Sequence, residues 1–342
     1  MKTVAVSLWE GQIRGEKPNA ATAIQLPVAN AVEHATTREL FVQTYNRFSH
    51  ACRAIEEPGV AIIAVDEHTR RAAGIVRLCA RVGRTVAAIV GRHDRCDLYL
   101  PHGDQLALRQ LAVVLGPVQS WQPGATGVRY RVIDLRTGHG MLDEHGRLLR
   151  GLRAEGPSIV RCAGYTLFIL PIGDPSDWPE RADDAWAMLP ERVYFDELEH
   201  SPDGSMPRAW PRRGDSRKSI VVRTSAALDT GMRLASEVDI AGTLEISGPN
   251  RTVTLRVGHH ALQSGVLLGR YGRCDGSELA DDSTLSRVHA LLIEDEHQLI
   301  VVDTASINGT RASGCEPARV NVLEDELCLG RRTRVRWRWL GG

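Results

Sequence analysis

The sequence predicts an all-β protein with a helical extension at its N-terminal end. Two observations lead to this fold class. Short β-type runs separated by Gly, Pro and Asp clusters fill most of the chain from about residue 60 onward, and one such region recurs in the second half. A length of 342 residues is enough for two or three domains, and a hydrophobic fraction of 43% is enough for buried cores.

A single amphipathic helix is predicted ahead of the β regions, within an N-terminal arm and helix at residues 1–59. Thr36 and Glu39 have capping-box spacing, and the helix should end near Pro58-Gly59. Its apolar stripe consists of Phe41, Tyr45, Phe48, Cys52 and Ile55. Such a stripe suits either packing on the neighbouring domain or docking to a partner, and we expect packing on the neighbouring domain.

Two β regions follow, each with the pattern of an antiparallel sandwich. In residues 60–175 the expected strands are Val60–Val65, Thr85–Val90, Leu111–Leu115, Arg129–Leu135 and Tyr165–Pro171. Residues 176–241 are polar and rich in Pro, and we expect a linker there. In residues 242–342 the expected strands are Thr252–Val257, Val266–Arg270, Ala290–Ile293, Gln298–Asp303 and Arg334–Leu340.

The two β regions are related by an internal repeat. Gly91–Leu115 aligns without gaps on Gly269–Ile293, with eight identities in 25 positions. Further along the chain, Asp134 aligns with Asp303 and Gly140 with Gly309. We therefore expect two similar domains in tandem rather than a solenoid, since no period of 20–50 residues occurs.

Composition excludes several classes of protein. The formal net charge is zero, so no nucleic-acid partner is expected. No Gly-Lys dipeptide occurs, which excludes a Walker loop, and the seven cysteines form no C-x-x-C pair. The histidines lack metal-binding spacing, and no G-x-S-x-G surrounds Ser286. We expect no catalytic residue, metal or cofactor, and hence no enzyme.

Targeting signals are likewise absent from the pattern. The N-terminal apolar stretch is broken by Glu10, Arg14 and Glu16, and no window approaches 18 consecutive apolar residues. Widely spread cysteines suit reduced thiols. These features predict a cytoplasmic protein without a membrane partner.

Three short motifs in the second β region follow one another at strand ends, where loops can gather into one site. They are Gly269-Arg270, Ser286-Arg287-Val288-His289 and Ser306-Ile307-Asn308-Gly309-Thr310. In this order and spacing they resemble the forkhead-associated (FHA) family. The resemblance implies an FHA domain over residues 242–342, a β-sandwich whose end loops bind phosphothreonine peptides.

The residue types suit that ligand. Phosphothreonine carries nearly two negative charges, which a planar guanidinium can meet with two hydrogen bonds. By the resemblance, Arg270 and Ser286 bind phosphate and Asn308 grips the peptide main chain. Thr284 and Arg287 are further candidates at the same site, and Gly269, His289 and Gly309 support it structurally. Ile307 departs from the family pattern, because many relatives carry a polar residue there.

In the first β region the ungapped alignment keeps an arginine, Arg92, at the position of Arg270, but the other site positions hold residues that do not suit a phosphate site. Leu108 aligns with Ser286, Leu111 with His289 and His139 with Asn308. A leucine beside a dianion offers no hydrogen bond and hinders solvation. We therefore expect a degenerate FHA-like domain, without phosphothreonine binding and with a structural role for Arg92.

These inferences favour a phosphothreonine-dependent adaptor in Ser/Thr kinase signalling. Its expected partner is a phosphothreonine-containing protein, either a Ser/Thr protein kinase or a substrate of one. The alternative is a constitutive subunit of a protein complex whose FHA folds dock partners regardless of phosphorylation.

Overall fold

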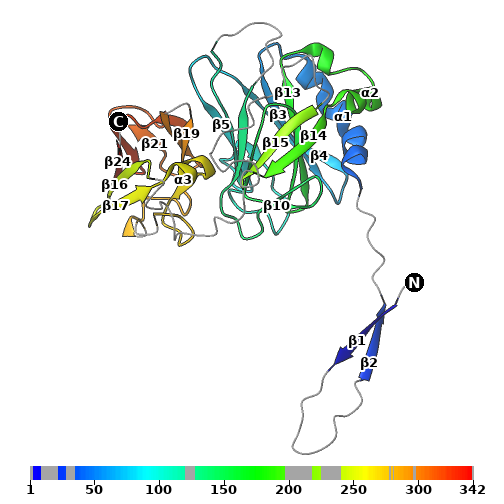
Figure 1. Ribbon diagram of the computed structural model, residues 1–342, viewed down its shortest axis with the longest axis horizontal. Helices are drawn as coiled ribbons and strands as arrows, with labels where there is room; N and C mark the ends of the chain where they lie inside the picture. The colour runs from blue at the N-terminus through cyan, green and yellow to red at the C-terminus, as the bar shows by residue number, and fades with distance from the viewer. Residues whose placement is uncertain are drawn as a thin grey trace, which may run out of the picture. The chain divides into compact units, whose positions relative to one another are not determined.

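The computed structural model describes residues 3–8, 22–27, 35–119, 128–196, 218–224, 240–276, 279, 281–295 and 298–340. The chain divides into two compact units, Met1–Thr36 and Thr37–Gly342. The first unit contains one antiparallel hairpin of β1 (Thr3–Leu8) and β2 (Thr22–Pro27), as Figure 1 shows. All further elements belong to the second unit.

The predicted helix is present as α1 (Thr37–Arg53), shorter at its end than expected. Its stripe residues Phe41, Tyr45, Phe48 and Cys52 are buried, whereas Ile55 lies beyond the helix and is only half-buried. Phe41 lies 5.5 Å from Phe168 of β13 (Tyr165–Ile172), measured between ring centroids. Tyr45 stacks on Trp178 just after η1 (Pro175–Asp177), and Phe41 also meets Trp186 of α2 (Ala182–Met188). The stripe is thus used for packing on the adjacent sandwich, as expected, and is not exposed for a partner.

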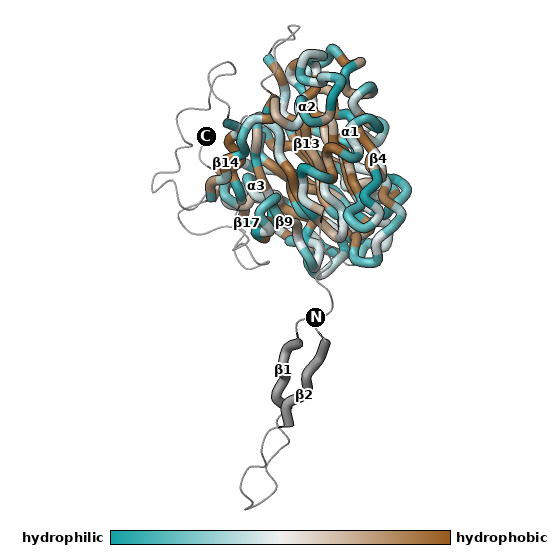
Figure 2. The backbone as a smooth tube through the Cα atoms, turned by 90° about the vertical axis from the view of Figure 1, so that its right-hand side faces the viewer, coloured by the Kyte–Doolittle hydropathy of each residue, from teal (hydrophilic) through white to brown (hydrophobic). Residues whose placement is uncertain are grey.

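The first sandwich has two sheets. The six-stranded sheet has the order β10-β9-β12-β13-β3-β4 and the seven-stranded sheet the order β14-β15-β11-β8-β7-β5-β6. β13 lies in a brown, hydrophobic region of Figure 2, in line with its almost continuous burial. The remaining strands of the six-stranded sheet are β3 (Gly59–Asp66), β4 (Arg71–Cys79), β9 (Met141–Asp143), β10 (Leu148–Leu149) and β12 (Ser158–Cys162). Those of the seven-stranded sheet are β5 (Val86–Gly91), β6 (Leu98–Tyr99), β7 (Leu111–Leu115), β8 (Tyr130–Asp134), β11 (Gly151–Ala154), β14 (Glu191–Asp196) and β15 (Lys218–Thr224).

The structure differs from the linker that we expected over residues 176–241. That stretch contains α2 and two strands, because β15 pairs with β11 and β14 pairs in parallel with β15. Val221 is buried in the sandwich core, and Arg223 Nε donates to the buried carboxylate of Asp143 at 2.9 Å. A strand as short as Lys218–Thr224 gives little pattern beside Pro- and Arg-rich surroundings, and its partner strand lies far away in sequence.

The second sandwich pairs a five-stranded sheet, β17-β16-β24-β23-β21, with a four-stranded sheet, β18-β19-β20-β22. In β24 (Thr333–Trp339) Val335 and Trp337 are buried while the intervening arginines are exposed, so the strand alternates between the core and the surface up to the exposed Trp339. The other elements are β16 (Gly242–Ser247), β17 (Thr252–Val257), α3 (His259–Ser264), β18 (Val266–Leu268), β19 (Ala290–Asp295), β20 (Gln298–Asp303), β21 (Thr310–Ala312), β22 (Val320–Val322) and β23 (Glu326–Leu329).

The two sandwiches pack against each other through equivalent sheet faces. Alternate residues of β7 point into the first core, while Ala112 and Val114 join a separate cluster with Leu291 and Ile293 of β19. Both faces of these strands are therefore buried, which explains their unbroken apolar runs. This inter-sandwich cluster has 14 buried members, drawn from both domains.

The polar rim of the contact is reciprocal. Arg136 of the first sandwich donates to Asp275 of the second at 2.7 Å. In return, Arg319 of the second pairs with Asp97 of the first at 3.3 Å. Asp97 and Asp275 occupy the same place in the repeat, since each accepts the main-chain N–H of a strand residue eight positions earlier at 2.8 Å.

The strand registers also correct the repeat itself. Val90 pairs with Leu111 in the first sandwich, and Leu268 pairs with Ala290 in the second. Val90 therefore corresponds to Leu268, 178 residues later, and Leu111 corresponds to Ala290, 179 residues later. The correct alignment of the two copies thus has a one-residue gap between these two strands. The ungapped alignment was wrong beyond the gap. The counterpart of Ser286 is Ala107 rather than Leu108, because each accepts from the N–H of its domain's motif arginine.

Candidate functional site

The motif residues come together at one end of the second sandwich. Arg270 directly follows β18, Ser286 and Arg287 precede β19, and Asn308 lies in the turn from β20 to β21. Main-chain hydrogen bonds join these loops: the Arg270 N–H donates to Ser286 O at 3.2 Å, and the Gly330 N–H donates to Gly309 O at 3.0 Å. The structure therefore gathers all predicted site residues into one loop cluster.

Two glycines permit this close approach. A Cβ at Gly269 would lie 2.2 Å from the carbonyl oxygen of Arg287, so no other residue fits without moving the loop. Gly309 has a φ of +75°, which a side chain resists, and a Cβ there would meet Pro317 at 2.6 Å. Both glycines thus have the supporting position that we predicted.

His289 holds the loops from the inside. Its Nδ1 accepts from the Ser286 N–H at 3.0 Å, and its Nε2 lies 3.1 Å from Gly309 O. The Gly330 N–H also lies 3.1 Å from Nε2, but Gly309 O accepts that proton at 3.0 Å. With Nδ1 as acceptor, the neutral ring therefore carries its proton on Nε2, which faces the same carbonyl. Burial lowers the pKa of His289, which favours this neutral form.

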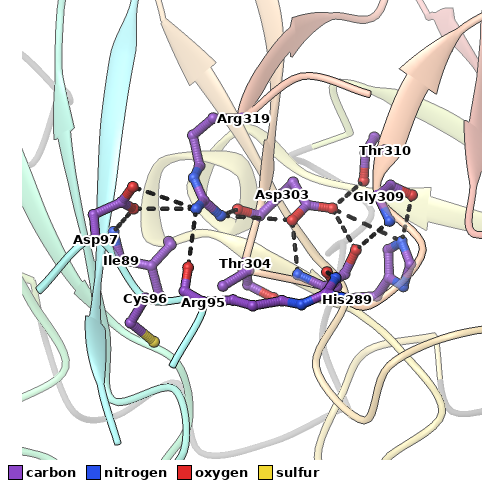
Figure 3. A network of polar contacts seen from close by, with 12 residues as sticks. Ile89, Arg95, Cys96, Asp97, His289, Asp303, Thr304, Gly309, Thr310 and Arg319 are labelled. Atoms are coloured by element: carbon purple, nitrogen blue, oxygen red, sulfur yellow. Dashed lines mark hydrogen bonds and ion pairs between the residues drawn. The ribbon is translucent and has the colours of Figure 1, made fainter. Parts of the chain in front are cut away.

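Asp303 organises the turn that carries Asn308 (Figure 3). Its carboxylate accepts from the Ser306 hydroxyl at 2.6 Å and from the Thr310 hydroxyl at 2.9 Å. The Ser306 oxygen in turn accepts from the Gly309 N–H at 2.9 Å. Sequence reasoning quoted these residues as part of a motif but assigned them no role, although an Asp at a strand end followed by Ser, Asn and Gly is typical of a turn.

Ser286 and Asn308 keep unused hydrogen-bonding groups in this cluster. The Ser286 hydroxyl oxygen accepts from the Ile307 N–H at 3.1 Å, which leaves its own proton free to donate. One Asn308 Nδ2–H donates to Thr284 O at 2.7 Å, which fixes the side chain. The second N–H and the Oδ1 of Asn308 make no hydrogen bond among the described residues.

Two guanidinium groups lie at the outer surface of the cluster. Arg270 is exposed, and among the described residues its side chain makes one hydrogen bond, from Nε to Leu285 O at 3.0 Å. Arg287 is also exposed, and its side chain has no ion pair within the part of the chain that the structure describes. The site thus presents positive charge that no described carboxylate neutralises.

Thr284 is held differently from the other candidates. Its hydroxyl donates to Asp282 at 2.7 Å and accepts from the Arg331 N–H at 3.3 Å. Burial raises the pKa of Asp282, but the hydrogen bonds from Thr333 and Thr284 together outweigh burial, and the pKa is lowered overall. Because its proton is directed to Asp282, Thr284 shapes the loop rather than offering a donor to a ligand.

The first sandwich repeats the supporting contacts without the ligand-facing groups. Gln110 takes the place of His289: it accepts from the Ala107 N–H at 3.0 Å and donates to Gly140 O at 3.3 Å. Thr137 bonds Asp134 at 2.6 Å, as Ser306 bonds Asp303. Ala107, however, has no hydroxyl. The internal framework is conserved between the copies, whereas the outer donors differ.

Arg92 departs from expectation. Its side chain is exposed and makes no hydrogen bond with any described residue. No hydrogen bond of this side chain therefore supports the structural role that we predicted for it. Only its main-chain N–H is used, in a bond to Ala107 O at 3.0 Å.

Two arginines of the first sandwich reach the site loop of the second. Arg95 Nη1 donates to Ser306 O at 3.1 Å and to Ile307 O at 2.6 Å. The buried Arg109 donates from Nη2 to Ala305 O at 2.7 Å. Sequence reasoning missed both, because nothing in the local pattern shows that the two copies touch.

Within the part of the chain that the structure describes, no group of three or more His, Cys, Asp or Glu side chains could hold a metal ion. Among the same residues, no helix has the length and apolar composition needed to cross a membrane.

Comparisons with known proteins give fold-level matches only. No family model matches the chain, and no curated protein matches it. Solved structures do match. The first FHA domain of Mycobacterium tuberculosis Rv1747 is 21% identical, over 28% of this chain and 97% of that one, with a TM-score of 0.23. The FHA domain of Chlamydia trachomatis CT664 is 19% identical, over 28% and 95%, with a TM-score of 0.25.

A structure from a study of phosphothreonine-dependent FHA domain interactions is 21% identical, over 29% of this chain and 99% of that one, with a TM-score of 0.24. Because these TM-scores lie below 0.5, we base the assignment on the chain itself. Its C-terminal sandwich combines two antiparallel sheets with Gly-Arg, Ser-Arg-x-His and Asn-Gly-Thr motifs in adjoining end loops. The C-terminal sandwich thus has the two-sheet fold and the end-loop motifs that the resemblance to the FHA family implies.

Proposed function

We propose that the C-terminal sandwich binds phosphothreonine peptides at the loop cluster around Arg270, Ser286 and Asn308. The observation that carries the proposal is the exposed, uncompensated pair of guanidiniums of Arg270 and Arg287 beside the free hydroxyl proton of Ser286. A dianionic phosphate accepts several such donors at once, and charge-assisted hydrogen bonds are the stronger kind.

Each residue is assigned a role by the hydrogen-bonding groups that its contacts within the protein leave unused. Arg270 donates from its two terminal nitrogens to the phosphate, Ser286 adds a hydroxyl donor, and Arg287 contributes charge. Asn308 uses its remaining N–H and Oδ1 on the peptide main chain, which offers both an acceptor and a donor. Thr284, whose hydroxyl is committed to Asp282, supports Asn308 through its carbonyl oxygen.

The first sandwich, in this proposal, is a degenerate FHA-like copy that does not read phosphate. Ala107 replaces the serine and His139 stands in the place of the asparagine, so two donors are missing around Arg92. Its packing on the second sandwich makes it a structural support for its sibling.

At the level of the cell we propose an adaptor that recruits a threonine-phosphorylated protein, either a Ser/Thr kinase or a kinase substrate. The second candidate is a constitutive subunit of a protein complex. One observation favours it: Ile307 is 60% exposed and offers no polar side chain near the phosphate position.

Binding of the full chain to an oriented phosphothreonine peptide library tests the proposal, with unphosphorylated peptides and the Arg270→Ala variant as controls. Selective binding that is lost in the variant supports the adaptor. Absence of phosphate-dependent binding would instead favour the constitutive subunit.

A further inference from the structure

An open pocket of about 350 Å³ lies where the two sandwiches meet, next to Asn308. Residues of the second sandwich provide most of its wall, and Arg95 of the first sandwich closes it. Because Asn308 lines both this pocket and the proposed phosphopeptide site, a peptide held by Asn308 passes the pocket mouth.

Arg95 lies in this wall and has N–H groups that no described residue accepts. Its Nη1 binds the carbonyl oxygens of Ser306 and Ile307, while its Nε and Nη2 have no partner among the described residues. The side chain pairs with no described carboxylate and belongs to an exposed residue. It therefore presents a positive charge and three N–H groups toward the pocket.

The other charged groups of the pocket wall have described partners. Arg319 donates to Asp303 O at 2.8 Å and pairs with Asp97 at 3.3 Å. The carboxylate of Asp303 is buried, accepts from Ser306 and Thr310, and lies 3.6 Å from Arg319. Arg95 is thus the charged group of the wall without a described partner of opposite charge, and it favours an anionic occupant.

The same contacts hold the site loop in place. Three consecutive carbonyls, those of Ala305, Ser306 and Ile307, accept from Arg109 and Arg95 of the first sandwich. The position of the following residue, Asn308, therefore depends on a neighbouring domain as well as on its own turn.

Resting on the function proposed above, we infer that the phosphopeptide site is composite: Arg95 of the first sandwich forms a subsite beside Asn308 that selects an acidic peptide side chain. Arg95 is then a specificity residue that also positions the loop. The degenerate copy thus takes part in ligand recognition through Arg95, which contacts the site loop of the second sandwich, rather than through a phosphate site of its own.

The test uses the full chain and a set of phosphothreonine peptides in which each flanking position carries Asp or Asn in turn. We expect the wild type to favour Asp over Asn by roughly threefold to tenfold at one or two neighbouring positions, as for a partly exposed ion pair. Arg95→Ala should bring this ratio to about one, and Arg95→Lys should keep part of it because the charge remains.

Arg273→Ala is the matched control. Arg273 is the repeat counterpart of Arg95, and its Nη1 would lie 3.3 Å from a Cβ at Gly138, in the loop of the first sandwich. This variant should retain the full Asp preference. Thermal unfolding of each variant shows that a changed ratio does not reflect lost folding.

The outcomes separate the two proposals. If the wild type binds no phosphothreonine peptide, the proposed function fails, and this inference fails with it. If it binds phosphothreonine but shows no Asp preference at any position, or keeps the preference in Arg95→Ala, the composite subsite is overturned while the proposed function stands.

Discussion

The end loops of the two sandwiches share an internal framework and differ in what they expose. In each, an aspartate at the end of a central strand bonds a hydroxyl three residues later, Asp303 with Ser306 and Asp134 with Thr137. In each, an amide or imidazole side chain joins two loops. The outer groups, by contrast, differ: Ser286 offers a hydroxyl where Ala107 has none. The loop structure is therefore the same although the hydrogen-bond donors that it exposes are not.

The largest expected difference between the copies concerns their motif arginines. Arg270→Ala should weaken phosphothreonine-peptide binding by about 2–5 kcal/mol, since it removes one partner of a desolvated charge pair. Arg92→Ala, at the equivalent position, should leave binding unchanged. Titration calorimetry on the full chain measures both. A comparable loss in Arg92→Ala would show that the first copy reads phosphate.

The packing between the sandwiches is tested on β19, where neighbouring residues face opposite ways. Leu291 faces the first sandwich and Leu292 the core of the second. Truncation of a buried leucine to alanine costs about 2–5 kcal/mol, and we expect both variants to fall in this range by chemical denaturation. A cost near zero for Leu291→Ala, with the full cost for Leu292→Ala, would contradict the inter-sandwich contact.

The serine position gives a smaller effect and tests the corrected repeat. Ser286→Ala makes the second site like the first and should cost about 1.5–3 kcal/mol of phosphopeptide binding, as for a hydrogen bond to a charged group. Ala107→Ser, the reverse change, should leave the fold stable. If it perturbs folding while Leu108→Ser does not, the one-residue gap is misplaced.

The smallest effect at neutral pH is expected for His289→Gln, which copies Gln110. The amide can make the same two contacts, so stability at pH 7 should change by less than about 1 kcal/mol. Because burial lowers the pKa of His289, its contribution to stability is complete above the unfolded-state pKa of about 6.5.

As the pH falls through that value, the unfolded chain takes up a proton that the folded chain resists. Stability is then lost at no more than about 1.4 kcal/mol per pH unit. The variant should lack this loss. Equal losses in wild type and variant between pH 7 and pH 5, measured by denaturant unfolding, would show that His289 is not the group that titrates.

Much of each sandwich could be predicted from the sequence. The expected Leu111–Leu115 and Gln298–Asp303 coincide with β7 and β20, because apolar runs bounded by turn residues carry a local signal. The motif loops were also local, and the structure gathers them as expected. The alignment gap was not found, because the ungapped alignment of Gly91–Leu115 on Gly269–Ile293 already gives eight identities in 25 positions.

The sequence by itself determined the all-β class, the position of α1 and the residues of the candidate site, since periodicity, caps and turn residues act over a few positions. Only the tertiary structure decided three further features: β14 and β15 complete the first sandwich, Ala107 answers Ser286, and Arg95 reaches the loop of Asn308. Each depends on pairing or packing between residues distant in the chain. An apolar strand face has the same composition whether it covers its own core or a neighbouring domain, so sequence pattern does not distinguish these arrangements.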